Sequence, residues 1–218
     1  FTLAYNNWGL ALQAKGRNDE AIEKYRLATE VDPDFAVAYN SWGVLLRIKG
    51  DYDGAIEKYK RATDIDPNYA VAFNSWGVAL AAKKDAPGSI ERYKRAAEID
   101  PQYATPFYNW GIALARIDDY DGAIEKYKRA VEINPRYVSA LNNWGVVLSA
   151  KKDYEGAIQK YKAATDIDPG HVRGFSNWAK ALAALGKDDE AAAMRKHASD
   201  LEARAGSATQ STNTTDPG

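Results

Sequence analysis

The polar side chains that recur at one fixed place in this chain are carboxamides, each beside a tryptophan. Asparagine stands directly before the tryptophan or one residue earlier, with Ser41 and Ser75 in two of these places; the asparagines are Asn6, Asn7, Asn40, Asn74, Asn109, Asn142, Asn143 and Asn177. A carboxamide offers both a hydrogen-bond donor and an acceptor, so a row of them suits the backbone of an extended peptide. The alternative is that these amides only bridge neighbouring helices, and the sequence leaves both open.

The tryptophans themselves define a repeat, since each lies 34 residues after the one before. They are Trp8, Trp42, Trp76, Trp110, Trp144 and Trp178, and Pro33, Pro67, Pro101, Pro135 and Pro169 keep the same interval. A fixed period of this length is typical of stacked repeats in which each unit contacts only its neighbours. We therefore predict repeats over 2–35, 36–69, 70–103, 104–137, 138–171 and 172–205.

Within the unit 36–69, the apolar pattern predicts two helices. Apolar residues cover most faces of 36–49, which is typical of a helix with neighbours on several sides. Over 52–65 they follow a single stripe, with charged residues opposite. Gly50 can take the left-handed conformation that ends the first helix, and Pro67 ends the second. The unit is a helix–turn–helix.

Catalytic chemistry has little support in these residues. The chain has no cysteine, which excludes disulfides and thiolate chemistry, and it has no glycine-rich phosphate loop, paired metal ligands or nucleophile motif. His171 takes the place of an aromatic residue in the other repeats and is interpreted as a packing residue; His197 lies on the polar last helix. We predict a protein that is not an enzyme, with no metal and no cofactor.

Charge and hydropathy exclude further classes. With 29 Lys and Arg against 30 Asp and Glu the net charge is −1, and the pI is near 6.2, which argues against a nucleic-acid partner. No run of about 18 apolar residues is present, so we expect no membrane span in this chain. The compartment stays open, with the cytoplasm favoured. Because Phe1 is not an initiator Met and already lies inside a repeat, we expect further sequence upstream.

The spacing of Gly43, Gly50, Tyr59 and Pro67 resembles the tetratricopeptide repeat, and the resemblance covers about residues 2–203. It implies an all-α, right-handed α-solenoid of twelve helices, a superhelix whose first helices line a concave groove. Small residues recur where helices approach closely, and a tyrosine in each second helix is expected to fill the gap between them. The tryptophans, at a place where the family usually carries leucine, are interpreted as a buried spine; the alternative is that some of them reach the groove.

The same resemblance assigns the candidate groove residues. They are the amides Asn7, Asn40, Asn74, Asn109, Asn143 and Asn177, the aliphatic stripe Leu10, Val44, Val78, Ile112 and Val146, and the two arginines Arg47 and Arg116. Leu3, Val37 and Val71 lie seven residues before Leu10, Val44 and Val78. The lysine and asparagine clamp of chaperone-binding members is absent, so binding of a terminal carboxylate by that clamp is not expected. An apolar groove with an amide edge suits an amphipathic helix or a partly apolar extended segment.

The two ends of the chain differ from the central repeats. The last predicted helix, roughly 188–205, has only a thin apolar stripe, as expected of a terminal cap. Residues 206–218 are polar apart from one alanine and are predicted to form a disordered tail after a repeat domain spanning 1–205.

The leading hypothesis is a non-catalytic interaction scaffold that holds a peptide or helix of a partner protein in the groove. One alternative is self-assembly through the uncapped first helix, giving a homo-oligomer. Another is the recruiting or regulatory arm of a larger enzyme. The residues do not identify the partner or the pathway.

Overall fold

The structure, a computed structural model, describes residues 1–212, with side chains described through Ala205. All regular elements in this part are α-helices. The chain divides into two compact units, Phe1–Ile117 and Asp118–Gly218, and the division falls inside the predicted repeat 104–137. The continuity of one domain over 1–205 therefore stays a prediction.

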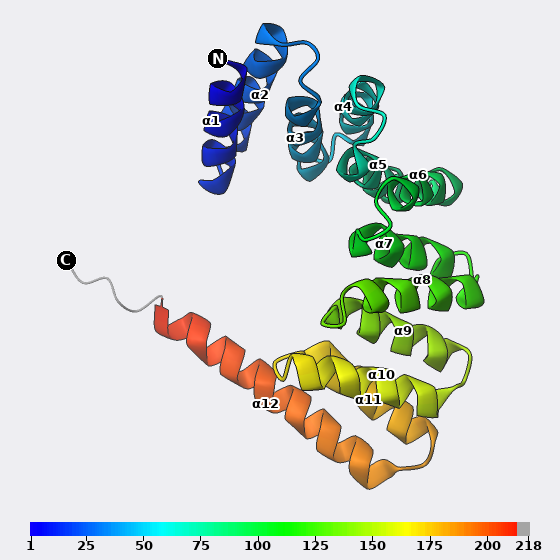
Figure 1. The fold of residues 1–218 in the computed structure, drawn as a ribbon. Helices are drawn as coiled ribbons and strands as arrows, with labels where there is room; N and C mark the ends of the chain where they lie inside the picture. The colour runs from blue at the N-terminus through cyan, green and yellow to red at the C-terminus, as the bar shows by residue number, and fades with distance from the viewer. Residues whose placement is uncertain (213–218) are drawn as a thin grey trace, which may run out of the picture. The chain divides into compact units, whose positions relative to one another are not determined.

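The first unit holds seven helices arranged as consecutive pairs (Figure 1). They are α1 (Thr2–Ala14), α2 (Asn18–Val31), α3 (Ala36–Ile48), α4 (Tyr52–Ile65), α5 (Ala70–Ala82), α6 (Ala86–Ile99) and α7 (Ala104–Ala115). In this unit α1 packs on α2, α3 on α4 and α5 on α6, and α3, α5 and α7 also contact one another in sequence. The first helices thus form one continuous layer.

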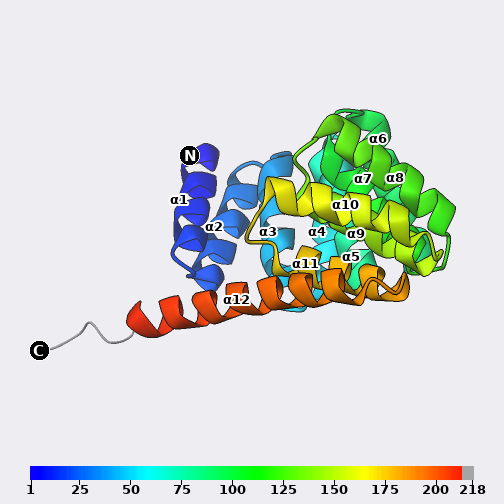
Figure 2. The ribbon, with the colours of Figure 1, turned by 90° about the horizontal axis from the view of Figure 1, so that it is seen from below.

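The second unit repeats this arrangement, and Figure 2 gives a second view of its helices. It consists of α8 (Tyr120–Ile133), α9 (Val138–Ala150), α10 (Tyr154–Ile167), α11 (Val172–Ala184) and α12 (Asp188–Thr212). Here α9 packs on α10 and α11 on α12, while α9 also contacts α11. The predicted helix–turn–helix repeat is confirmed in both units.

The boundaries of α3 and α4 follow from local chemistry. Gly50 has a φ of 85°, the left-handed conformation predicted for it. The Asp51 carboxylate accepts a hydrogen bond from the backbone N–H of Gly54 at 2.9 Å, which satisfies one of the free donors at the start of α4. Lys84 and Lys152 stand at the equivalent place of Gly50 and also have positive φ, 65° and 64°. These two lysines hold a conformation that costs more for a residue with a Cβ.

Five of the six repeats carry a buried tyrosine in their core: Tyr25, Tyr59, Tyr93, Tyr127 and Tyr161. Tyr59 is fully buried with Ala55 and Ala79, and Leu46 and Trp76 pack against the cluster. Gly43 lies so close that a Cβ there would be 2.7 Å from the Tyr59 ring. The predicted role of the tyrosine, filling the gap between paired helices, is confirmed.

At the C-terminus, α12 continues further than the sequence indicates. The helix reaches Thr212, so it includes residues 206–212, which polarity assigns to a disordered tail. Once a helix has formed, each added residue gains a backbone hydrogen bond without needing an apolar face. A polar composition alone therefore does not predict where α12 ends. The rest of the predicted tail, 213–218, lies outside the described residues.

Candidate interaction surface

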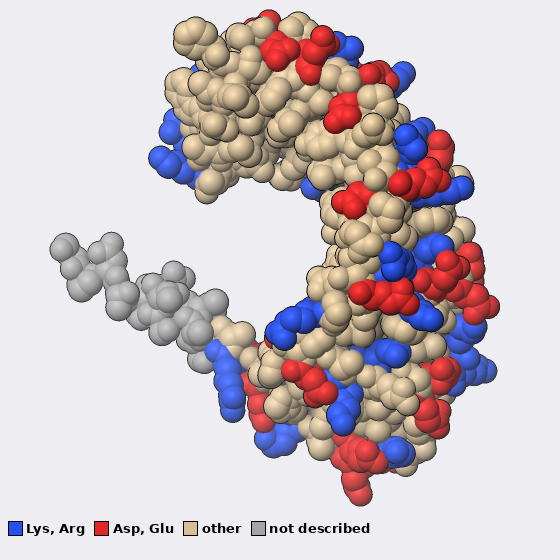
Figure 3. Space-filling view, in the orientation of Figure 1, with Lys and Arg blue, Asp and Glu red and all other residues tan. Residues whose placement is uncertain are grey.

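The surface formed by the first helices of the first unit is apolar and carries few charges. In the space-filling view, charged side chains gather over α4 and α6, whereas the surface of α3 is mostly uncharged (Figure 3). Val37 and Val71 lie in the first turns of α3 and α5 at equivalent places and are 40% and 42% exposed, and Leu3, at the same place in α1, is 65% exposed. Aliphatic side chains exposed in one register are typical of a contact surface.

The predicted groove residues differ in exposure. In the stripe, Leu10 and Val146 are exposed, while Val44, Val78 and Ile112 are half-buried. Val44 packs against the Tyr59 cluster, so it contributes to the core as well as to the surface. Arg47 is half-buried and Arg116 is exposed at the end of α7. The stripe is therefore present, but only part of each side chain faces outward.

The amides form two sets. Asn7 is exposed, and Asn109, Asn143 and Asn177 are half-buried. Asn40 and Asn74, which were expected among the groove residues, are only 8% and 7% exposed. They lie one residue before the position that the resemblance places in the groove, and on a helix that step of about 100° turns a side chain toward the neighbouring repeat. Their expected exposure is thus corrected.

Two of the amides bridge neighbouring repeats. Asn109 donates through its Nδ2 to the Oδ1 of Asn74 at 3.0 Å, and Asn177 donates in the same way to Asn142 at 3.1 Å. The Asn142 Nδ2 also donates to the Asn143 Oδ1 at 3.3 Å. At the same 35-residue offset from Asn40 stands Ser75, which is shorter, and the buried Oδ1 of Asn40 has no hydrogen-bond partner. For these pairs the structure agrees with the alternative that the amides bridge neighbouring helices.

This offset leads to a stability prediction. Asn109→Ala removes the bridge and leaves the buried Asn74 carbonyl unsatisfied, so we expect a loss of about 1–3 kcal/mol in the free energy of unfolding. Ser75→Asn supplies the missing partner of Asn40, and we expect a gain of about 1 kcal/mol. Denaturant titrations followed by circular dichroism measure both. Equal stability of Asn109→Ala and the wild type would show that the bridge contributes nothing.

The tryptophans pack mainly between repeats. Trp42 contacts the core cluster of the first repeat, which includes Leu12 and Tyr25, and the Lys58 ammonium lies 4.4 Å from the centre of its ring. Trp76 similarly packs on the Tyr59 cluster beneath the Arg92 guanidinium. Trp8, on the first helix of the chain, is instead 53% exposed. Trp42 and Trp76 are half-buried packing residues, so they contribute to the contact between repeats without being fully buried as the spine interpretation expects.

A pocket lies between the third and fourth repeats of the first unit, and sequence reasoning missed it. Its volume is about 780 Å³, within the range of small-ligand sites. It brings together four predicted groove residues: Val78, Asn109, Ile112 and Arg116. Its remaining lining is Ala81, Ala82, Lys84, Ala86, Ser89, Tyr93, Ala113 and Ile117.

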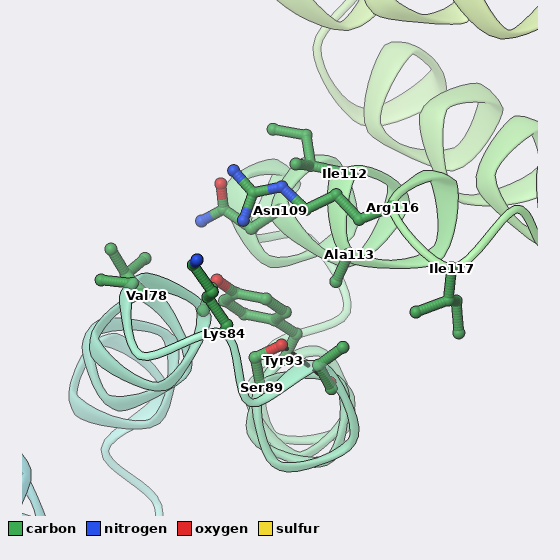
Figure 4. Close-up of a pocket in the computed structure, with 12 residues that line it drawn as sticks. Val78, Lys84, Ser89, Tyr93, Asn109, Ile112, Ala113, Arg116 and Ile117 are labelled. Carbon is green, nitrogen blue, oxygen red and sulfur yellow. Dashed lines mark hydrogen bonds between the residues drawn. The ribbon is translucent and has the colours of Figure 1, made fainter.

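The polar groups of this pocket gather on one side. In Figure 4 the polar ends of Lys84, Tyr93, Asn109 and Arg116 point toward the same part of the cavity. Burial raises the pKa of Tyr93 to about 12, an effect that the positive charges of Arg116 and Arg47 partly offset. The Tyr93 hydroxyl is therefore a neutral donor at physiological pH. The pocket combines an apolar floor with donors and positive charge.

The described residues provide no site for metal chemistry or for crossing a membrane. Within residues 1–212 no helix has both the length and the apolar composition of a membrane span. In the same part of the chain, His, Asp and Glu side chains nowhere gather in groups of three or more that could hold a metal ion.

Comparison with known proteins agrees with this geometry. The TPR repeat family profile matches residues 9–46, 43–84 and 77–118, and the tetratricopeptide repeat profile matches 108–172. The chain belongs to the tetratricopeptide repeat family, whose members bind protein partners. A crystal structure of MamA is 30% identical, with a TM-score of 0.71 over 76% of this chain and 96% of that one.

Two further solved structures share the fold. YrrB, titled a TPR protein with an unusual peptide-binding site, is 24% identical with a TM-score of 0.66, covering 81% of this chain and 91% of that one. The Pseudomonas aeruginosa pilF protein is 20% identical with a TM-score of 0.79, covering 93% and 97%. No curated protein sequence matches this chain. The family and the MamA likeness fit a protein-interaction role.

Proposed function

We propose that this chain is a non-catalytic scaffold that binds a peptide or an amphipathic helix of a partner protein on the surface of its first helices. The observation that carries the proposal is the equivalent exposure of Val37 and Val71 on the adjacent helices α3 and α5. The core tyrosines are already buried, so exposed valines add nothing to the stability of the free protein. They instead offer apolar area to a ligand lying across the repeats.

The test compares two variants with the same change in net charge. Val37→Glu with Val71→Glu places two carboxylates on the proposed surface, and Lys60→Glu changes the charge equally on the exposed side of α4. All three positions are exposed, so we expect both variants to fold like the wild type. The three proteins are used to capture partners from a lysate of the source cells, with identification by mass spectrometry.

We expect a partner that is captured by the wild type and by Lys60→Glu, and that is depleted about tenfold or more by the double glutamate variant. Two buried carboxylates against an apolar ligand face account for this magnitude. A partner that the double variant captures as well as the wild type does would place binding elsewhere and contradict the proposal.

Self-association through α1 is the second candidate. Trp8 is 53% exposed and Leu3 is 65% exposed, whereas Trp42 and Trp76 pack against a preceding repeat. A second copy that covers this face would bury both side chains. Sedimentation equilibrium over a wide dilution series tests it, and a monomer mass at all concentrations rules it out.

A further inference from the structure

The pocket between the third and fourth repeats lies where the third repeat lacks a tyrosine that three other repeats carry. The first residue of the second helix is Tyr52 in α4, Tyr120 in α8 and Tyr154 in α10, but it is Ala86 in α6. In the fifth repeat the Tyr154 ring packs against a cluster of Ala157, Tyr161 and Ala181.

The residues equivalent to that cluster line the pocket. Two repeats earlier, Ser89, Tyr93 and Ala113 occupy the same places as Ala157, Tyr161 and Ala181, and Ala86 occupies the place of Tyr154. The surface on which an aromatic ring rests in the fifth repeat is thus present in the third, while the ring is absent. The cavity has the lining of an aromatic site.

A second observation concerns the hydroxyl of Tyr93. In two other repeats the residue twelve positions before the tyrosine partners its hydroxyl: Tyr25 donates to Gln13 at 2.9 Å, and Tyr161 and Ser149 lie 3.1 Å apart. Twelve positions before Tyr93 stands Ala81. Tyr93 is only 3% exposed, yet it lines the pocket, and Figure 4 shows its hydroxyl at the same part of the cavity as the ends of Lys84 and Arg116. A tyrosine hydroxyl that opens on a cavity can donate a hydrogen bond to an acceptor on a ligand.

The positive charges at the rim of the pocket restrict the class of ligand further. Lys83 pairs with Asp53, the carboxylate thirty residues earlier, as Lys49 pairs with Asp19. Lys84 and Arg116, which line the pocket, have no carboxylate within ion-pair distance among the described residues. Two positive charges beside an apolar cavity complement a ligand with a carboxylate next to its apolar group.

We infer that this pocket receives the aromatic side chain of a partner segment in which an aspartate or glutamate side chain adjoins a tyrosine or phenylalanine. The chain's own pattern supplies the ring part of this chemistry, because Tyr52, Tyr120 and Tyr154 hold that place in other repeats. The carboxylate is inferred from the positive charges of Lys84 and Arg116. The aromatic ring fills the place left by Ala86, and the carboxylate lies near Lys84 and Arg116. The inference deepens the proposed function and rests on it, since it names the anchor of the bound segment.

The probe is the blocked tetrapeptide acetyl-Gly-Asp-Tyr-Gly-amide, titrated into the ¹⁵N-labelled chain by NMR. We expect a Kd on the order of 1 mM or tighter from the typical affinity per atom of a well-placed small ligand. The amide signals of Ala82, Ala86 and Ala113 should shift. Replacing tyrosine by alanine in the probe should abolish binding, and replacing aspartate by asparagine should weaken it about twofold to fivefold.

The decisive variant is Ala86→Tyr, which restores the ring that three other repeats carry and so is expected to fold with an unchanged or higher Tm. It should abolish probe binding because the chain's own ring then occupies the site. Asn18→Tyr, at the equivalent place in the first repeat, is the matched control and should bind the probe like the wild type. Ala81→Gln, which gives Tyr93 an internal partner as Gln13 does for Tyr25, is a second blocking variant.

Lys84→Gln and Arg116→Gln test the charge, and each should weaken binding about twofold to fivefold. The inference is overturned if the probe does not bind the wild type, or if it binds Ala86→Tyr and Ala81→Gln as tightly as it binds the wild type. The two proposals can be distinguished. If a cellular partner is lost by Val37→Glu with Val71→Glu but retained by Ala86→Tyr, the scaffold function is supported and the pocket is rejected as its anchor.

Discussion

Gly43→Ala is expected to destabilise the first unit by about 1–3 kcal/mol, although alanine is the better helix former. In a helix interior this change normally adds about 1 kcal/mol of stability. Here a Cβ would lie 2.7 Å from Cε1 and 3.0 Å from Cδ1 of Tyr59. That ring is fully buried between Ala55 and Ala79, so it has no space into which it can move. Overpacking of a closed core costs more than the helix propensity returns.

The last repeat supplies the natural control for this clash. There Ala179 replaces the glycine and Arg195 replaces the tyrosine, and Ala179 is buried. Ala179→Gly should therefore destabilise by about 1 kcal/mol, the ordinary propensity effect. Denaturant unfolding of both variants measures the free energy of unfolding, and alanine relative to glycine should lower it at position 43 and raise it at position 179.

A double-mutant cycle isolates the contact itself. In a Tyr59→Leu background the ring is gone, and Gly43→Ala should be neutral or stabilising there. If Gly43→Ala stabilised the wild type as well, the close approach of glycine and tyrosine would not be what selects glycine at this position.

The second large effect is a loss of stability at alkaline pH. Burial raises the pKa of Tyr59 to about 12 and that of Tyr93 to about 12, and it also raises the pKa values of Tyr25 and Tyr161. In the unfolded chain a tyrosine titrates near pH 10. The folded state thus holds these protons more tightly, so the stability they contribute is complete below pH 10 and is lost as the pH rises to about 12.

For Tyr59 and Tyr93 the loss amounts to about 2–3 kcal/mol each by pH 12. Tyr59→Phe removes one titrating group, and the buried Tyr59 hydroxyl has no hydrogen-bond partner, so phenylalanine should be well tolerated. We expect the alkaline fall in denaturant midpoint to be smaller in Tyr59→Phe, while Tyr52→Phe, half-buried on the same helix, serves as the control. Midpoints measured from pH 8 to pH 12 give the comparison. An identical pH profile for Tyr59→Phe and the wild type contradicts the assignment to Tyr59.

Sequence periodicity predicted most of the fold correctly, and the repeat unit shows why. The ends of α3 and α4 are set by Gly50, Asp51 and Pro67, whose effects on the backbone are local. The contact of Gly43 with Tyr59 recurs at Gly9, Gly77 and Gly145 because the paired helices of those repeats meet in the same way. Local signals repeated in one register need no knowledge of distant parts of the chain.

The candidate site was harder to predict, because neighbouring residues on one helix face different surroundings. Adjacent amides such as Asn6 and Asn7 look alike in sequence, yet Asn6 is buried and Asn7 is exposed. The bridge from Asn109 to Asn74 depends on how one repeat packs on the next. A comparison of equivalent positions at an offset of 35 residues would have revealed the pairing.

The pocket corresponds to a signal in the sequence, namely small residues at places where other repeats carry larger ones. Ala86 is small where Tyr52, Tyr120 and Tyr154 are large, and Ala81 is small where Gln13 and Arg47 are long; each change alone resembles ordinary surface variation. Together they open one cavity because α5, α6 and α7 place the two positions around the Tyr93 ring.

The sequence by itself thus determined the repeat, its helices and its family, since these depend on local backbone chemistry and on a fixed period. Only the tertiary structure decided which amides are buried and where small residues combine into a pocket. Both depend on packing between repeats, where side chains more than thirty residues apart meet.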